Sequence, residues 1–185
     1  TLTLREKLKL FETVKQAVGG RGAVIAGTGT YSTAESIEMT REAERLGMDG
    51  VLLVVPYYNK PTQEGLFRHF EAIARSTRLP CILYNVPSRT GTNMTAETVI
   101  RLSHIPNIVG VKEASGDLAQ AARIIQGTRE DFRVWSGNDE DTLPLLAIGG
   151  YGVISVASHL VGVQIQTMIH SFLAGEREKA AEIHR

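Results

Sequence analysis

The sequence has very little cysteine and no excess of charge of either sign. Cys81 is the only cysteine among 185 residues. The chain therefore cannot form an internal disulfide or a cluster of thiolates around a metal. The 20 basic side chains balance 20 acidic ones, so there is no electrostatic footprint for nucleic acid or for an anionic membrane.

Long apolar runs and a signal peptide are also lacking. No stretch approaches the roughly 20 apolar residues that a membrane-spanning helix needs. These features favour the cytoplasm. The histidines are scattered without the spacing of metal ligands, and the run Asn138-Asp-Glu-Asp141 is interpreted as the acid-rich start of a helix, so no metal site is predicted. The histidines are His69, His104, His159, His170 and His184.

Short β-rich runs alternate with amphipathic segments along the whole chain. The expected strands are 23–26, 51–55, 81–84, 108–111, 133–135 and 152–156. Their starts lie roughly 20 to 30 residues apart, the length of one strand-plus-helix unit. Helices are expected between them, and the last two cover 139–148 and 158–173.

Several helix ends carry recognisable signals. Capping boxes are predicted for Thr3 with Glu6 and for Ser32 with Glu35. Further N-caps are expected at Thr95 and Asp117, and left-handed glycine caps at Gly47, Gly127 and Gly175.

Six successive strand–helix units indicate one domain, either a (β/α)8 barrel or an open doubly wound sheet. No G-x-G-x-x-G run follows a strand, so a dinucleotide site is not indicated. A complete barrel needs about 250 residues, so 185 residues cannot close one. Because residue 1 is not methionine and the last residues still have a helical pattern, we expect an internal piece of a longer protein.

Lys112 is the most informative single residue. It ends the apolar run Ile108-Val-Gly-Val-Lys112, which is typical of a strand buried on both faces. Burial of an ammonium is costly, and a lowered pKa would leave neutral amine that can attack a ketone. The alternative is a lysine whose head merely reaches solvent at the end of the strand.

The loops after the expected strands carry polar and aromatic residues. Tyr57 and Tyr58 follow the second strand, Tyr84 and Arg89 the third, and Gly137 the fifth. In either architecture the carboxyl ends of parallel strands form the functional edge. Tyrosine can move protons and arginine can hold a carboxylate, so the set suits carbon–carbon chemistry on a keto acid.

Four runs together resemble the dihydrodipicolinate synthase family, within the superfamily of pyruvate-dependent aldolases and N-acetylneuraminate lyase. They cover residues 55–61, 83–91, 109–116 and 149–156, in order along essentially the whole chain. The resemblance implies a (β/α)8 barrel of which residues 1–185 would form about six of eight units as a single partial domain. The first two strands and the C-terminal helices of the family would be absent.

The resemblance also implies roles for individual residues. Lys112 would form the Schiff base, Tyr84 would relay protons, and Tyr58 would cross a dimer interface to complete a neighbour's relay. Arg89 would hold the carboxylate of the aldehyde substrate. Gly137 and Ile154 would supply backbone positions near the lysine. The family's threonine turn, which holds the pyruvate carboxylate, would lie upstream of residue 1.

The implied reaction is condensation of pyruvate with L-aspartate 4-semialdehyde to 4-hydroxy-tetrahydrodipicolinate, on the way to lysine and diaminopimelate. No cofactor would be needed, and the full-length protein would form a homodimer or homotetramer. A regulatory lysine site is implied at Glu35 and Tyr57, although Leu4, Lys7 and Tyr31 depart from the family pattern there. The alternatives are a related lyase, acting on N-acetylneuraminate or a keto-sugar acid, and an inactive fragment or scaffold.

Overall fold

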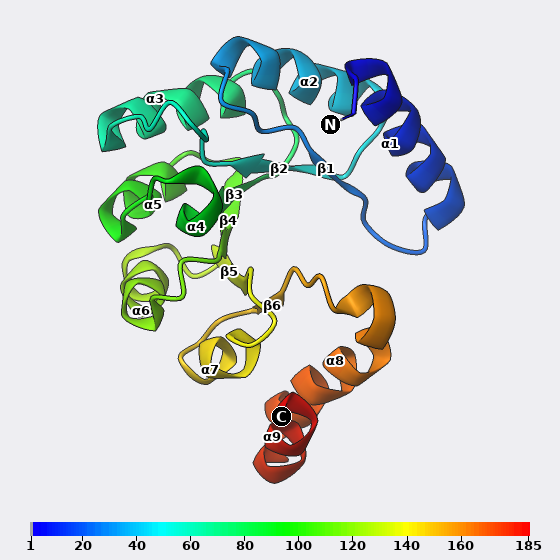
Figure 1. Cartoon of the computed structure of the whole chain (residues 1–185), viewed down its shortest axis with the longest axis vertical. Coiled ribbons are helices and arrows are strands. Elements are labelled where there is room, and N and C mark those ends of the chain that lie inside the picture. Colours follow the sequence, from blue (N-terminus) through cyan, green and yellow to red (C-terminus); the bar gives the residue numbers. More distant parts are fainter. Residues whose placement is uncertain (1) are drawn as a thin grey trace.

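Six parallel strands form one curved sheet in the order β1-β2-β3-β4-β5-β6 in the computed structural model, which describes residues 2–185 (Figure 1). The strands are β1 (Ile25–Gly27), β2 (Gly50–Val54), β3 (Cys81–Asn85), β4 (Ile108–Glu113), β5 (Arg133–Ser136) and β6 (Gly152–Val153). Each strand lies beside its predecessor, whereas a doubly wound sheet reverses its strand order at a switch point. The fold is therefore an incomplete (β/α)8 barrel.

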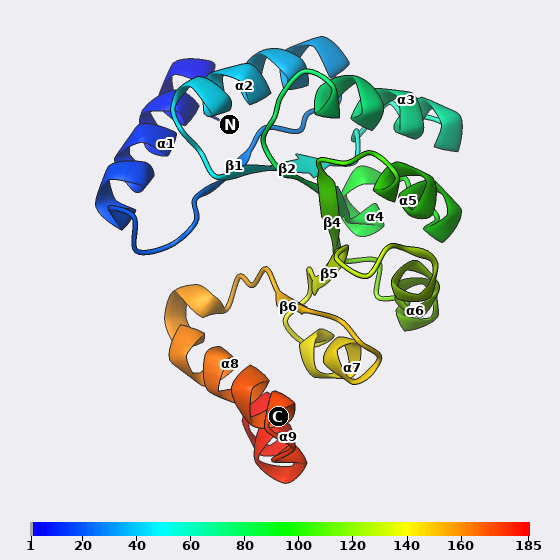
Figure 2. The ribbon, with the colours of Figure 1, turned by 180° about the vertical axis from the view of Figure 1, so that it is seen from behind.

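The helices form an arc around the convex side of the sheet, with α1 at one end and α8 and α9 at the other (Figures 1 and 2). Within residues 2–185, no helix combines the length and apolar character needed to cross a membrane. The helices are α1 (Leu4–Val18), α2 (Thr33–Arg45), α3 (Gln63–Ala74), α4 (Pro87–Thr90), α5 (Ala96–Ser103), α6 (Leu118–Gly127), α7 (Thr142–Ala147), α8 (Ser158–Leu173) and α9 (Arg177–His184).

Most of the predicted N-caps are confirmed. Thr3 and Glu6 form a complete capping box, and Thr95 and Asp117 cap α5 and α6 through their side chains. The second predicted box is only half formed. Ser32 accepts from the backbone N–H of Glu35 at 3.4 Å, but its own backbone N–H donates to a nearby threonine hydroxyl.

One predicted glycine cap is wrong. Gly47 and Gly175 do adopt left-handed backbone, with φ of 73° and 85°. Gly127 instead is the last residue of α6, and a Cβ there would lie 2.4 Å from Cδ1 of Ile100. Close packing against α5, rather than turn geometry, therefore explains this glycine.

Several boundaries differ from those expected. Strand β6 ends at Val153, three residues earlier than predicted, and α7 begins at Thr142 rather than at residue 139. The short helix α4 was not anticipated. Strand β4 runs on to Glu113, so Lys112 lies within the strand rather than after it.

The main core fills the space between the sheet and the outer helices. Leu83 of β3 and Val111 of β4 are fully buried in it. Because side chains alternate between the two faces of a strand, Asn85 and Glu113 point to the same side as this core. Tyr84 and Lys112 then face the concave side. The helices contribute residues that include Phe70, Val99 and Ile124.

Candidate active site

Lys112 and Tyr84 face each other on neighbouring strands. They are Cα partners in the parallel register of β3 and β4, and Nζ of Lys112 lies 4.4 Å from the centroid of the Tyr84 ring. Lys112 is only 8% exposed. Burial lowers the pKa of its ammonium below the ordinary value, although the carboxylate of Asp139 opposes the fall. The site thus shifts Lys112 toward its neutral, nucleophilic form.

Gly137 lies directly against the lysine side chain. A Cβ at this position would be 3.1 Å from Cε of Lys112 and 2.6 Å from Cβ of Ala114. Its backbone N–H donates to the carbonyl of Glu113 at 2.7 Å, which ties the end of β5 to the end of β4. The lysine stem occupies space that a larger residue would need.

Ile154 lies just beyond β6, where its backbone N–H donates to the carbonyl of Ser136 at 2.9 Å. This bond continues the pairing of β5 with β6 past the last strand residue. Ile154 is therefore at the same end of the sheet as Gly137, one strand further from Lys112.

Tyr84 and Arg89 belong to one stretch of chain. Tyr84 is partly buried near the end of β3, and Arg89 is exposed on α4, which starts two residues after the strand. Burial raises the pKa of the Tyr84 hydroxyl above its usual range, while the Arg89 guanidinium opposes the rise. Tyr84 is therefore protonated at neutral pH and can donate a proton.

The two tyrosines Tyr57 and Tyr58 lie on the loop that follows β2. Tyr58 is 93% exposed and has left-handed backbone, with φ of 75°. Tyr57 packs edge-on against Tyr31, with ring centroids 5.4 Å apart. Glu35 is exposed in the first turn of α2. These residues gather at the loops that follow β1 and β2.

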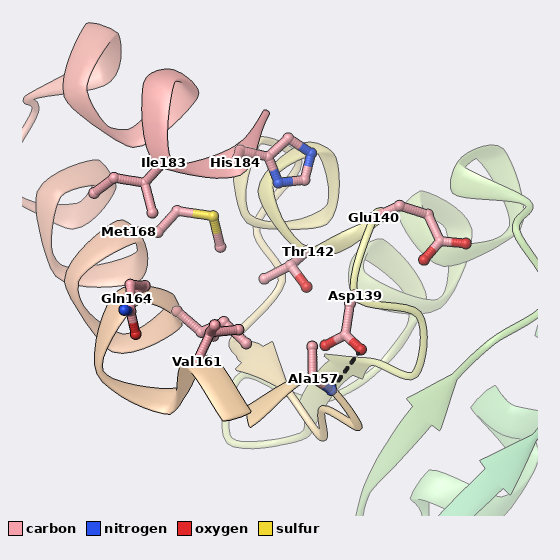
Figure 3. Close-up of a pocket in the computed structure, with 10 residues that line it drawn as sticks. Asp139, Glu140, Thr142, Ala157, Val161, Gln164, Met168, Ile183 and His184 are labelled. Atoms are coloured by element: carbon pink, nitrogen blue, oxygen red, sulfur yellow. Dashed lines mark hydrogen bonds between the residues drawn. The ribbon is translucent and has the colours of Figure 1, made fainter. Parts of the chain in front are cut away.

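Asp139 is a site residue that the sequence interpretation missed. Its Oδ2 accepts from the backbone N–H groups of Ala157 at 3.0 Å and Val156 at 3.3 Å, joining the loops after β5 and β6 (Figure 3). The run 138–141 does lead into α7, which has Asp141 as its N-cap and begins at Thr142, but Asp139 itself lies outside the helix. Its charge acts on Lys112 instead. Only its place just after a strand end could have signalled this.

A cleft of about 650 Å³ lies beside Asp139, between α7, α8 and α9 (Figure 3). Its wall is apolar where α8 and α9 contribute Val161, Met168 and Ile183. Lys112 does not line it. Among residues 2–185, no group of three or more histidine, cysteine or acidic side chains is arranged to hold a metal ion.

Glu113 and Asn85 form a second feature that the sequence interpretation missed. Both are buried on the core side of the sheet, directly after Lys112 and Tyr84. The Nδ2 of Asn85 donates to both carboxylate oxygens of Glu113 at 3.1 Å. Strand alternation could have revealed them, since both are polar at positions where the core expects apolar residues.

Comparison with known proteins agrees with this geometry. A sequence model of the Dihydrodipicolinate synthetase family matches residues 1–185. The 4-hydroxy-tetrahydrodipicolinate synthase of Dehalococcoides mccartyi is 67% identical over 185 residues, which are the whole of this chain and 62% of that protein. The enzyme of the same name from Moorella thermoacetica is 61% identical and is covered to 63%. The chain thus spans less than two thirds of these relatives.

Solved structures give the same result. The dihydrodipicolinate synthase of Bacillus anthracis is 50% identical and superposes with a TM-score of 0.98, over all of this chain and 63% of that one. The enzyme of Cyanidioschyzon merolae, solved with lysine bound, is 55% identical with a TM-score of 0.98 and the same coverage. The chain therefore belongs to the Dihydrodipicolinate synthetase family.

Proposed function

We propose that the full-length protein containing this chain condenses pyruvate with L-aspartate 4-semialdehyde to give 4-hydroxy-tetrahydrodipicolinate. The observation that carries the proposal is the buried Lys112 at the end of β4, with a lowered pKa and the Tyr84 ring 4.4 Å from its Nζ. Relatives up to 67% identical bear the name of this enzyme. The reaction belongs to the biosynthesis of lysine and diaminopimelate.

Lys112 starts the chemistry as a neutral amine. Its Nζ attacks the ketone carbon of pyruvate, and loss of water leaves an iminium. The iminium withdraws electrons, so the methyl group loses a proton and an enamine forms. The enamine carbon then attacks the aldehyde of the second substrate. The amine of that substrate finally displaces Lys112 and closes the ring, so the lysine itself does the work of a cofactor.

The neighbouring residues handle protons and orientation. Tyr84 keeps its proton because burial raises its pKa, and proton transfer at addition and dehydration would contribute roughly 10²–10⁴-fold. Arg89 is exposed on α4, where it can hold the carboxylate of the aldehyde substrate. Gly137 leaves room for the lysine stem, and Ile154 provides backbone at the end of β6.

The exposed tyrosines support a role across a subunit interface. Tyr58 is 93% exposed, as expected of a ring that completes the relay of a second copy in a homodimer or homotetramer. One solved relative is described as a monomeric variant, and a monomer in solution is the result that would contradict this role of Tyr58. Glu35 and Tyr57 would contact lysine as a regulator, and the lysine-bound relative from Cyanidioschyzon merolae makes this worth testing. We assign the protein to the cytoplasm.

Borohydride trapping with pyruvate tests the proposal in the intact gene product. Reduction of the iminium should add the pyruvate skeleton to Lys112, and mass spectrometry of the peptide should locate it there. Lys112→Ala should abolish the adduct, whereas Lys9→Ala, at an exposed lysine of α1, should leave it unchanged. Trapping should persist well below pH ~10.4, the ordinary pKa of lysine. An adduct that survives Lys112→Ala would contradict the assignment.

The acceptor is identified in a second assay. Pyruvate consumption with aspartate semialdehyde, but not with N-acetylmannosamine, supports the synthase. The reverse result indicates a sugar-acid lyase. No adduct with pyruvate in the intact protein would indicate a non-catalytic member of the family.

A further inference from the structure

The strand ends that present Tyr84 and Lys112 carry a second pair of residues on the opposite side of the sheet. Asn85 and Glu113 are the last residues of β3 and β4, and they are Cα partners, one step beyond Tyr84 and Lys112. Asn85 is fully buried and Glu113 is 5% exposed. Because the two pairs are adjacent in the strands, a movement of Asn85 and Glu113 also moves Tyr84 and Lys112.

Glu113 accepts hydrogen bonds from three separate segments. The Nδ2 of Asn85 donates to both of its oxygens at 3.1 Å. The backbone N–H of Ser115 donates to Oε1 at 2.7 Å, and Nε2 of Gln120, on α6, donates to Oε2 at 3.3 Å. In turn Oδ1 of Asn85 accepts from the backbone N–H of Met94 at 3.0 Å. The carboxylate thus fastens β3, β4, the loop after β4 and α6 to one another.

This arrangement is a costly way to fill space. The donors are neutral amides rather than cations, and burial raises the pKa of the Glu113 carboxyl, against the effect of these hydrogen bonds. A buried carboxylate without a cationic partner costs stability, and an apolar side chain of similar size would pack at less cost. The carboxylate instead orients its neighbours, because it accepts hydrogen bonds from several donors at once and fixes their geometry.

We infer that Glu113 is a positioning residue for the Schiff-base lysine, because its bonds to Asn85, Ser115 and Gln120 hold the ends of β3 and β4 in the register that keeps Lys112 against Tyr84. The inference rests on the proposed function for its catalytic consequence. The backbone supports it: the N–H of Ala114 donates to the carbonyl of Asn85 at 2.8 Å, and that of Gly137 to the carbonyl of Glu113 at 2.7 Å.

The central experiment replaces the carboxylate by its amide in the intact gene product. Glu113→Gln keeps the size but turns one acceptor oxygen into an amide group that meets the donors of Asn85 or Gln120. The double variant Asn85→Asp with Glu113→Gln exchanges the acceptor and the donor between the two side chains. Asn93, whose Oδ1 accepts from Nδ2 of Asn85 at 2.8 Å, can turn its amide and donate to the new carboxylate. The matched control is Thr98→Val, because Thr98 is 2% exposed and its hydroxyl donates to Gln63 at 2.7 Å, between α5 and α3.

Three measurements are made on each variant: the melting temperature, the rate of pyruvate trapping at pH 8, and the pH midpoint of Lys112 acylation by acetic anhydride, followed by mass spectrometry. Glu113→Gln should slow trapping by about 10- to 100-fold, as expected when a reacting group is displaced by about 1 Å. Its acylation midpoint should move upward, because a loosened strand end lets water reach the lysine. The double variant should recover most of both losses.

Thr98→Val should lower the melting temperature and leave the midpoint unchanged. The inference is overturned if Glu113→Gln keeps the wild-type midpoint and trapping rate. A lower melting temperature alone, as expected for Thr98→Val, would show only a loss of stability and would overturn it too. If Glu113→Gln does not fold, Gln120→Met removes the 3.3 Å bond to Glu113 together with the bonds of Gln120 to Asn93 and Met94, and leaves the carboxylate in place. It should shift the midpoint in the same direction; an unshifted midpoint overturns the inference. Wild-type protein that traps no pyruvate refutes the proposed function, while the acylation midpoints still decide the role of Glu113.

Discussion

Gly137→Ala offers a sharp test of the site, because the structure specifies what the added methyl group would meet. The new Cβ would lie 2.6 Å from Cβ of Ala114, which is attached directly to the backbone and cannot rotate away. It would also lie 3.1 Å from Cε and 3.2 Å from Cγ of Lys112. The lysine stem is flexible, so the amine would move out of its place beside Tyr84.

Two effects should appear together. Overpacking of this kind costs about 1–3 kcal/mol of unfolding free energy, which urea denaturation can measure. Displacement of the amine by about 1 Å should slow borohydride-trapped adduct formation by up to roughly 100-fold. The matched control is Gly152→Ala in β6, where the nearest atom to an added Cβ is Cδ1 of Trp135 at 3.8 Å, an ordinary contact. The reasoning is refuted if the two variants trap pyruvate at the same rate and are equally stable.

Two further predictions concern buried titratable groups outside the site. Burial lowers the pKa of His69 to about 4, below the ordinary value of about 6.5 for the unfolded chain. The unfolded state therefore binds the proton first, and stability should fall by up to about 3 kcal/mol between pH ~6.5 and pH ~4. Urea unfolding at pH 7 and pH 5 should show a smaller difference for His69→Gln than for wild type, and equal differences would contradict the prediction. Burial also raises the pKa of the Cys81 thiol to about 12, so Ellman's reagent at pH 8 should label it only after unfolding; rapid labelling of native protein would disprove this.

The local pattern of the sequence was enough to place Lys112. An apolar run that ends in a lysine predicts a buried amine at a strand end, and the lysine is 8% exposed on β4. The N-caps at Thr3, Thr95 and Asp117 were predictable for the same reason, since each depends on residues only three positions away. The choice of barrel over doubly wound sheet needed the resemblance, because both folds share the alternation of strands and helices.

Features that depend on contacts between distant segments could not be predicted from the sequence. Gly127 follows the pattern of a helix cap, but its environment is set by Ile100 on another helix. Asp139 lies among acids that suggest a helix start, yet its partners are the backbone amides of residues 156 and 157. The bonds of Glu113 reach 28 residues back to Asn85. Such contacts come from the tertiary packing of strands and helices, and a short stretch of sequence does not contain both partners.

The left-handed backbone at Tyr58 bears on any attempt to make this protein more heat-resistant. A tyrosine with φ of 75° carries a conformational cost of order 1–3 kcal/mol, which glycine avoids. A directed-evolution screen that rewards thermal tolerance alone would therefore favour Tyr58→Gly. That substitution would discard a ring that is 93% exposed, so such a screen should be coupled to selection for turnover.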